Sequence, residues 1–185
     1  MMKTEFQKMR SEELYDFSDP EINASLIRAK EKCLRLNALT LSSEHYREAL
    51  NEVIPGVPES SAVCPPFQCD HGNGISIGEN SFLNYGCIIL DGATVTIGND
   101  VKIGPACQLL TAAHPIDYKA RRGTCETSHP ITIGDDTWLG GGVIVCPGVT
   151  IGRRCVIAAG SVVIRDIPDD CLAAGNPAVV KRKLR

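Results

Sequence analysis

The sequence predicts an all-β fold, a parallel β-helix, preceded by a short helical region, and three observations support this fold class. Aliphatic residues recur every six positions from residue 97 onward. A polar stretch over residues 115–130 interrupts this repeat once. The composition also changes near residue 60, from a region rich in Glu, Lys, Arg and Leu to a Gly-rich one. A short fixed repeat is typical of solenoids, in which each repeat packs only on its neighbours.

Residues 1–58 are expected to form a small helical subdomain. Helices are predicted over about 3–16, 20–36 and 43–53. The second helix has apolar residues three or four positions apart, which indicates one buried face formed by Ile22, Leu26, Ala29, Cys33 and Leu36. Several prolines after residue 54 end the helical pattern, because proline removes a backbone donor and clashes with the preceding turn.

Residues 59–185 are expected to form the β-helix. Hexads begin at 97, 103 and 109, then at 133, 139, 145, 151, 157 and 163, with a less regular set from Ile77 and Leu83. Each hexad makes one strand and one turn, so three hexads close a triangular coil. The aliphatic first residue points inward, and the glycine that often follows is expected to permit the dihedral angles of the turn.

The fifth position of the hexads is small or β-branched, as a narrow prism requires. It holds Val101, Cys107, Thr137, Val143, Val149, Cys155 and Ser161, and Cys87 occupies the same position earlier. The chain has nine cysteines that do not form CxxC pairs, so they are predicted to be small core residues rather than a zinc site or a redox motif. A β-sandwich would need alternation with a period of two and hairpin turns.

Composition and charge exclude several classes of function. The net charge is −3 and no basic surface dominates, so no nucleic-acid partner is expected. No apolar run reaches the roughly 18 residues of a membrane helix. The N-terminal residues are charged and lack the apolar region of a signal peptide. A cytoplasmic protein without a membrane partner is therefore expected.

The hexad repeat breaks directly after His114. Ile97 and Ile133 are 36 residues apart, which predicts two full coils with segment 115–130 replacing most of one. A long excursion from a solenoid projects from one face and commonly carries function. We expect a cleft beside it, lined by His114, Asn84, Asp91 and Trp138.

Five segments of the chain occur together in one known family. They are FQCDHGNGISIGENSFLNYGCIILD, TAAHP, PITIGDDTWLGGGVIVCPGVTIG, IAAGSVVIRDIP and LAAGNPAVVKRKL. They resemble the maltose, galactoside and nodulation-type O-acetyltransferases, and MRSEELYDFSDPEI is similar to the helical subdomain of maltose acetyltransferases. The resemblance implies a left-handed β-helix and a homotrimer with active sites between subunits. It also implies acetyl-CoA as co-substrate, a saccharide acceptor and no metal.

The same resemblance implies three residues that carry out acetyl transfer. His114 matches the catalytic histidine of the T-x-x-H-P pattern and would take the proton from the acceptor hydroxyl; otherwise it is a polar residue that closes a turn. Asn84 matches a residue that binds the acceptor and stabilises the transition state, although asparagine is also common in turns. Glu126 matches a loop glutamate of the maltose-type enzymes that orients the histidine, or it is a solvated loop carboxylate.

Residues that bind the acceptor are implied as well. Asp70 and Asp91 are candidates for hydrogen bonds to acceptor hydroxyls, or they are carboxylates that close turns. In the N-terminal region the residues that could close the acceptor pocket are Tyr15, Asp16 and Arg28. Galactoside enzymes have an aspartate at the position of Gly92, so this departure is closer to the maltose and nodulation-type pattern. They also have an acceptor-binding aspartate at the position of Phe17, and its loss argues against the three N-terminal candidates.

The resemblance places CoA along the C-terminal coils. Trp138 could pack on the pantetheine arm or wall the cleft. The other matched positions, where small side chains permit close approach and a cation meets phosphate, are Gly141, Ala159, Gly160, Ile164, Arg165 and Arg182. Val179 replaces a second CoA-binding arginine of the family, and Lys181 or Lys183 could compensate for it.

Three other functions stay open at this point. One is an acetyltransferase of the same fold with a non-sugar acceptor, and another is a non-catalytic scaffold. A metalloenzyme resembling γ-carbonic anhydrase would need three converging histidines, and the remaining ones are His45, His71 and His129. The expected histidine pair on successive coils is absent from the sequence.

Overall fold

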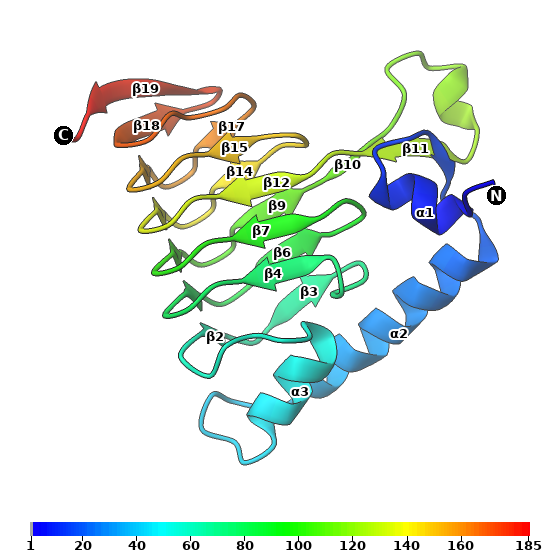
Figure 1. Ribbon diagram of the computed structural model, residues 1–185, viewed down its shortest axis with the longest axis horizontal. Helices are drawn as coiled ribbons and strands as arrows, with labels where there is room; N and C mark the ends of the chain where they lie inside the picture. Colours follow the sequence, from blue (N-terminus) through cyan, green and yellow to red (C-terminus); the bar gives the residue numbers. More distant parts are fainter. Residues whose placement is uncertain (1) are drawn as a thin grey trace.

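A computed structural model describes residues 2–185, and a β-helix of six coils forms most of it (Figure 1). Three parallel sheets make the faces of a triangular prism. The first face contains β2 (Ala62–Val63), β5 (Phe82–Leu83), β8 (Lys102–Ile103), β13 (Trp138–Leu139), β16 (Val156–Ile157) and β18 (Cys171–Gly175), with β19 (Ala178–Lys183) antiparallel to β18. The expected fold class, a left-handed parallel β-helix with N-terminal helices, is confirmed.

The other two faces follow in the same order along each coil. The second face contains β3 (Phe67–Cys69), β6 (Cys87–Leu90), β9 (Gln108–Leu110), β14 (Ile144–Val145) and β17 (Val162–Val163). The third contains β4 (Ile75–Ile77), β7 (Val95–Ile97), β12 (Ile131–Ile133) and β15 (Thr150–Ile151). We name the corners of the prism after the faces they join: the 1–2, 2–3 and 3–1 corners.

Aliphatic side chains of successive coils stack inside the prism. Ile97 lies opposite Ile133, which lies opposite Ile151, and each is at most 1% exposed. The predicted fifth-position residues from Val101 to Ser161 are at most 2% exposed, so their assignment to the narrow interior is confirmed. Burying one aliphatic side chain stabilises the fold by about 1.5–3 kcal/mol.

The expected role of the second-position glycines is wrong. Gly98, Gly134 and Gly152 do not have a positive φ. They are required because neighbouring coils approach closely, and a Cβ on Gly134 would lie 2.7 Å from the Arg153 amide nitrogen. The left-handed residue is instead the fourth of seven of the nine hexads, at Asp100, Ala106, Asp136, Gly142, Gly148, Arg154 and Gly160.

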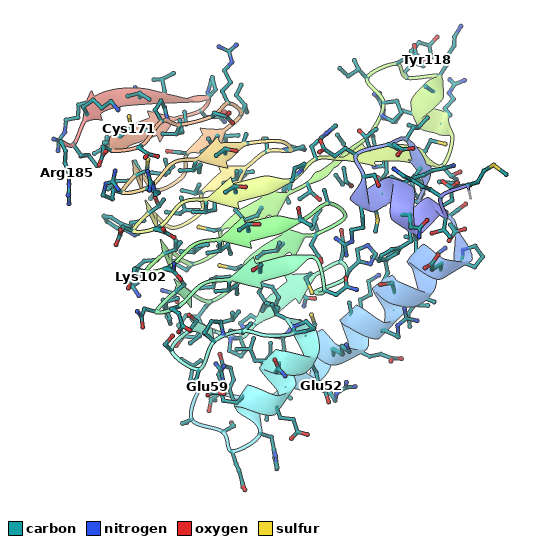
Figure 2. All side chains as sticks on the ribbon, viewed as in Figure 1. Glu52, Glu59, Lys102, Tyr118, Cys171 and Arg185 are labelled. Carbon is teal, nitrogen blue, oxygen red and sulfur yellow. The ribbon has the colours of Figure 1, made fainter. Side chains whose placement is uncertain are left out.

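The expected coil count across the interruption is also wrong. Because β7 and β12 are hydrogen-bonded neighbours, Ile97 and Ile133 lie one coil apart, not two. The additional residues therefore leave the solenoid at the 2–3 corner without occupying a coil. This excursion contains β10 (Ala112–Ala113), the short 3-10 helix η1 (Ala120–Arg122) and β11 (Cys125–Ser128). Figure 2 shows Tyr118 near its tip, on the opposite side of the molecule from Arg185.

The 2–3 corner is wider in the first two coils than in the later ones. Ile77 and Ile97 pair at a spacing of 20 residues, whereas Ile133 and Ile151 pair at 18. The two additional residues lie between Cys69 and Ile75 in the first coil, and at the same corner in the second. The sequence around Asp70 and Asp91 therefore bulges outward on the side from which the excursion leaves.

Two of the three predicted helices are found close to their expected positions. α2 (Pro20–Asn37) begins at Asp19, whose carboxylate accepts a hydrogen bond from the Glu21 amide at 2.8 Å. α3 (Tyr46–Val53) follows, and both helices share one core with the first coils and close that end of the prism (Figure 1). The boundary expected at residues 58 and 59 falls between α3 and β2, and the division into two domains stays a prediction.

The first predicted helix, over 3–16, is wrong in its second half. α1 (Glu5–Arg10) has a capping box at Thr4 and ends at Ser11. Glu12 then adopts a φ of 62°, and β1 (Tyr15–Asp16) pairs antiparallel with β11. Pairing with a strand more than a hundred residues later overrides the local helical preference, so the segment becomes a strand above the 2–3 corner.

The structure also describes the cysteines and the surroundings of other ligand-forming residues. Seven of the nine cysteines are buried, and no disulfide links any of them in residues 2–185. In the same range, no group of three or more His, Cys, Asp or Glu side chains is arranged to hold a metal ion. None of the helices in these residues has the length and apolarity to span a bilayer.

The close approach at the 3–1 corner predicts that Gly134→Ala lowers the free energy of unfolding by about 1–3 kcal/mol, because the new methyl group overlaps the next coil. Chemical denaturation followed by circular dichroism measures this change. Gly123→Ala is the control, since Gly123 lies in the excursion and its nearest neighbour is 3.3 Å from the added Cβ. Equal stability of both variants would contradict the role of Gly134.

Candidate active site

His114 lies at the 2–3 corner directly after β10. The antiparallel pairing of β10 with β11 brings it opposite Glu126, and its Nδ1 lies 3.4 Å from Glu126 Oε2. The imidazole is about half exposed, and the ring of Phe17 meets it edge-on at 5.9 Å between centroids. A carboxylate beside Nδ1 favours the tautomer that carries its proton there, so Nε2 is left with a free lone pair.

Glu126 is largely buried, and the carboxylate oxygen remote from His114 has its own partner. The Tyr15 hydroxyl donates to Oε1, and the same hydroxyl lies 3.1 Å from Ser128 Oγ. Burial, together with the Glu126 hydrogen bond, raises the pKa of Tyr15 far above its ordinary value, so this phenol stays a proton donor. Glu126 therefore lies beside the His114 imidazole rather than in solvent, and its role in orienting that ring stays a prediction.

A cleft of about 410 Å³ opens beside His114, and we call it the His114 cleft. Its polar walls come from the widened corner and from β11, and its apolar walls come from α1, β1 and α2. The lining residues are Met9, Tyr15, Phe17, Ile22, Asn23, Leu26, Asp70, His71, Leu90, Gly92, Ala112, His114 and Glu126. A cleft with a few convergent titratable groups among apolar side chains is typical of a small-molecule site.

Asp70 and His71 face this cleft with shifted ionisation. Burial, with help from the negative charges of Asp91 and Glu126, raises the pKa of Asp70 to about 6. Burial lowers the pKa of His71 to about 4, and its Nδ1 lies 2.9 Å from Ser25 Oγ. His71 is therefore neutral near pH 7. The sequence predicts no role for His71. Its position next to Asp70, where the 2–3 corner of the first coil has two additional residues, is the feature of the sequence that points to this cleft.

Asp91 is fully buried, and its side chain links backbone segments of the 2–3 corner. Its carboxylate oxygens accept hydrogen bonds from the His71 amide at 2.8 Å and the Gly74 amide at 2.9 Å. The Arg10 guanidinium lies 3.8 Å from the carboxylate and donates to the backbone oxygens of Asp91 and Gly92. Of the two alternatives for Asp91, the structure supports the carboxylate that closes a turn, because both of its oxygens already hold backbone amides.

The expected cleft shared by His114, Asn84 and Trp138 is wrong for a single chain. Asn84 lies at the 1–2 corner, where its Oδ1 accepts from the Tyr85 amide at 2.8 Å. Trp138 is 54% exposed on the first face. Neither lines the His114 cleft, because the 1–2 corner and the first face both lie away from the 2–3 corner.

The remaining N-terminal candidates also lie outside the lining of the cleft. Asp16 accepts hydrogen bonds from the amide and hydroxyl of Ser18 at 2.9 and 2.7 Å, which holds the pKa of its carboxyl below the usual value. Arg28 is exposed on α2. Phe17, which follows Asp16, forms the wall next to His114 instead.

The positions matched to CoA binding fall into three places. Gly141, Ala159 and Gly160 stack at the 1–2 corner, where the Gly160 amide donates to the Gly141 oxygen and a Cβ on Gly160 would meet nothing within 4 Å. Ile164 and Arg165 are exposed at the 2–3 corner. The C-terminal strand β19 presents Val179, Lys181, Arg182 and Lys183, all exposed. At Gly141, Ala159 and Gly160 the small side chains therefore leave the backbone of the 1–2 corner open to close approach.

A second, mostly apolar cleft of about 330 Å³ also includes His114 in its lining. It is lined by Leu14, Ala113, His114, Pro115, Ile116 and Thr127. His114 therefore lines both a cleft with titratable walls and an apolar one. An oriented imidazole that reaches two such spaces can take a proton from one bound molecule while that molecule attacks another.

Comparison with known proteins identifies the class of this chain. Residues 130–165 match the family described as bacterial transferase hexapeptide (six repeats), and residues 8–54 match the maltose acetyltransferase hexapeptide capping motif. Nodulation protein L of Rhizobium meliloti (strain 1021) is 45% identical over 186 residues, which cover 98% of this chain and 100% of that protein.

Two solved structures extend the likeness to the whole chain. A maltose O-acetyltransferase from Clostridium difficile 630 superposes with a TM-score of 0.96 at 38% identity, over 99% of this chain and 98% of that one. A hexapeptide-repeat acetyltransferase, VCA0836 from Vibrio cholerae O1 biovar eltor, was solved with acetyl-CoA. It superposes with a TM-score of 0.87 at 38% identity, over 99% of this chain and 100% of that one. The chain therefore belongs to the hexapeptide-repeat acetyltransferases of the maltose acetyltransferase type and is an acetyl-CoA-dependent acetyltransferase.

Proposed function

We propose that this enzyme transfers the acetyl group to a hydroxyl of a saccharide by direct attack, with His114 as the general base. Nε2 of His114 takes the hydroxyl proton while the oxygen attacks the thioester carbonyl. The carbon–sulfur bond then breaks, and the thiolate receives the proton from His114. The single observation that carries the proposal is the His114 imidazole, which has Glu126 Oε2 3.4 Å from its Nδ1 and lines two clefts.

The His114 cleft supports a saccharide as acceptor. A sugar ring presents hydroxyl groups around its rim and apolar C–H bonds on its faces. Asp70 and His71 offer hydrogen-bonding partners, while Phe17 and Leu26 offer apolar surface. Maltose, the saccharide after which the Clostridium difficile neighbour is named, has this chemistry. A maltose-like or related saccharide is therefore the proposed acceptor.

The active site is proposed to be completed by a second subunit of a homotrimer. In one chain, His114 lies at the 2–3 corner, whereas Asn84 lies at the 1–2 corner. The small residues Gly141, Ala159 and Gly160 also lie at the 1–2 corner. Packing of three prisms side by side would face one corner toward the other around a closed ring. Asn84 of the neighbour would then donate to the oxyanion, and its 1–2 corner would receive the pantetheine arm.

His114→Ala is expected to lower kcat for acetyl transfer by about 10²–10⁴, because the hydroxyl loses its general base. Thiol release from acetyl-CoA over a panel of saccharides, amino sugars and non-sugar alcohols measures this and also identifies the acceptor class. His45→Ala is the control, since His45 also faces a glutamate, Glu48, at 3.6 Å but lies next to α3. Undiminished turnover in His114→Ala would overturn the assignment of the base, and wild-type turnover only with non-saccharides would overturn the acceptor.

Two inactive variants, His114→Ala and Asn84→Ala, are expected to restore activity when co-expressed. In randomly mixed trimers roughly a quarter of the interfaces combine an intact His114 with an intact Asn84 of the neighbour, so about a quarter of wild-type activity should return. Each variant expressed alone is the control. A mixture as inactive as the separate variants would show that both residues serve one site within a single chain.

Asp70→Asn is expected to stabilise the protein near neutral pH while weakening acceptor binding. The folded protein raises the pKa of Asp70 from 3.8 to about 6, so the native state binds this proton more tightly and loses stability as the pH rises from about 4 to 6. Removing the charge should recover on the order of 1–3 kcal/mol above pH 6 and nothing below pH 4.

Thermal denaturation of wild type and Asp70→Asn at pH 4 and pH 7.5 checks the sign, with the acid measurement as the internal control. Steady-state kinetics should show a higher KM for the acceptor and an unchanged KM for acetyl-CoA. A variant that is less stable than wild type only at pH 7.5 would show that the carboxylate is favourably paired.

A further inference from the structure

The Tyr15 hydroxyl lies at the centre of a series of polar contacts that runs from Ser128 through Glu126 to His114. Tyr15 is 2% exposed, and its register partner across the β1–β11 ladder is Glu126. The hydroxyl donates to Glu126 Oε1, while Glu126 Oε2 faces His114 Nδ1 at 3.4 Å. The two carboxylate oxygens are thus divided between two partners. Tyr15 does not touch the imidazole and can act on it only through Glu126.

The direction of the hydrogen bonds along this series follows from the partners. A carboxylate oxygen only accepts, so the Tyr15 proton points toward Glu126. Ser128 is fully buried, and its Oγ lies 3.1 Å from the Tyr15 oxygen, which leaves Ser128 as the donor in that pair. The donors therefore run from Ser128 to Tyr15 to Glu126, and the other Glu126 oxygen faces His114 Nδ1 at 3.4 Å.

The absence of a side chain at Gly92, at the 2–3 corner, leaves room for Ser128 to contact the Tyr15 hydroxyl. A Cβ on Gly92 would overlap Ser128 Oγ and lie 3.5 Å from the Tyr15 hydroxyl oxygen. Any larger residue at position 92 would push Ser128 away from Tyr15. The contact of Tyr15 with Ser128 therefore depends on glycine at position 92.

The N-terminal segment holds Tyr15 in place from both sides. The Asp16 amide donates to Glu5 Oε2 at 2.7 Å, and the Phe17 amide donates to the Thr124 oxygen at 2.9 Å. Arg10 fastens α1 to the corner through the Gly92 oxygen at 3.0 Å. These contacts fix the Tyr15 backbone, so its hydroxyl reaches Glu126 from a rigid support.

We propose that Tyr15 is a positioning residue that fixes the Glu126 carboxylate against Nδ1 of His114 and thereby selects the tautomer with a free Nε2. The inference rests on the proposed role of His114 as the base. It assigns to the helical N-terminal region a part in the chemistry, since the segment that carries Tyr15 connects α1 to α2. Without the Tyr15 hydroxyl, the Glu126 carboxylate can rotate away from the imidazole, and His114 is free to adopt the Nε2–H tautomer that free imidazole prefers.

Tyr15→Phe tests this, because phenylalanine keeps the buried ring and removes only the hydroxyl. We expect kcat to fall about tenfold and the KM for acetyl-CoA to change less than twofold. In protein labelled with ¹⁵N-histidine, the ring nitrogen shifts of His114, assigned by their loss in His114→Ala, should show the Nδ1–H tautomer in wild type. In Tyr15→Phe these shifts should move toward the Nε2–H tautomer.

Tyr46→Phe is the matched control. Tyr46 is also a buried tyrosine, and its hydroxyl donates to the Val63 oxygen at 2.9 Å on the side of the molecule that α3 covers. This variant loses a buried hydrogen bond as Tyr15→Phe does, but it should leave kcat and the His114 shifts unchanged. A general loss of packing would affect both variants alike and would not move the tautomer.

A double-mutant cycle with Glu126→Gln completes the test. If Tyr15 acts through Glu126, Tyr15→Phe adds no further loss of kcat and no further tautomer change in the Glu126→Gln background. Unchanged His114 shifts in Tyr15→Phe, or fully additive losses in the cycle, would overturn the inference. The nuclear magnetic resonance readout does not require turnover, so failure of the proposed acetyl transfer, seen as undiminished activity of His114→Ala, is distinguishable from failure of the role of Tyr15.

Discussion

The stacking of inward aliphatic side chains along three faces is the constraint on which the rest of this molecule depends. Each coil must return its first-position residue to a place directly above the previous one, as Ile133 does above Ile97. A short fixed number of residues satisfies this closure, and any excess must leave at a corner. Residues between β9 and β12 leave at the 2–3 corner while the stack continues unbroken. The stack of inward side chains is therefore the same from coil to coil, and coils differ in length only at their corners.

The candidate active site lies at the 2–3 corner, where the additional residues leave the prism. The excursion turns back as β11, which pairs with β10 on one side and with β1 on the other. This three-stranded sheet is the only one outside the prism in residues 2–185, and it joins the N-terminal region to the coil that carries His114. Glu126 lies on its central strand and therefore contacts both neighbours, Tyr15 and His114. The orientation of the imidazole is thus set by strand pairing rather than by the solenoid itself.

The sequence predicts the parts of this structure that depend on local repetition, and misses those that depend on distant pairing. The hexads and the apolar face of α2 are periodic, so the prism and its helical end could be anticipated. β1 lies in a segment with helical composition and becomes a strand only because β11 is available beside it. The contact of Tyr15 with Glu126 depends on the same pairing, so the sequence does not reveal it. Asp91 is expected to line the cleft, but it is a fully buried residue that binds backbone amides of the corner. Counting from Ile97 to Ile133 failed because spacing alone does not distinguish an additional coil from an excursion.

His114 lies at the 2–3 corner, whereas Asn84 and the glycine-rich residues lie at the 1–2 corner. The proposed active site therefore needs residues from two subunits. A crystal structure of the protein with CoA and a saccharide tests it most directly. We expect the CoA sulfur within about 3–4 Å of His114 Nε2 of one subunit. The pantetheine arm should lie along Gly141 and Ala159 of the neighbouring subunit, with the saccharide in the His114 cleft. CoA bound wholly to one chain, or with its sulfur remote from His114, would contradict a site shared between subunits.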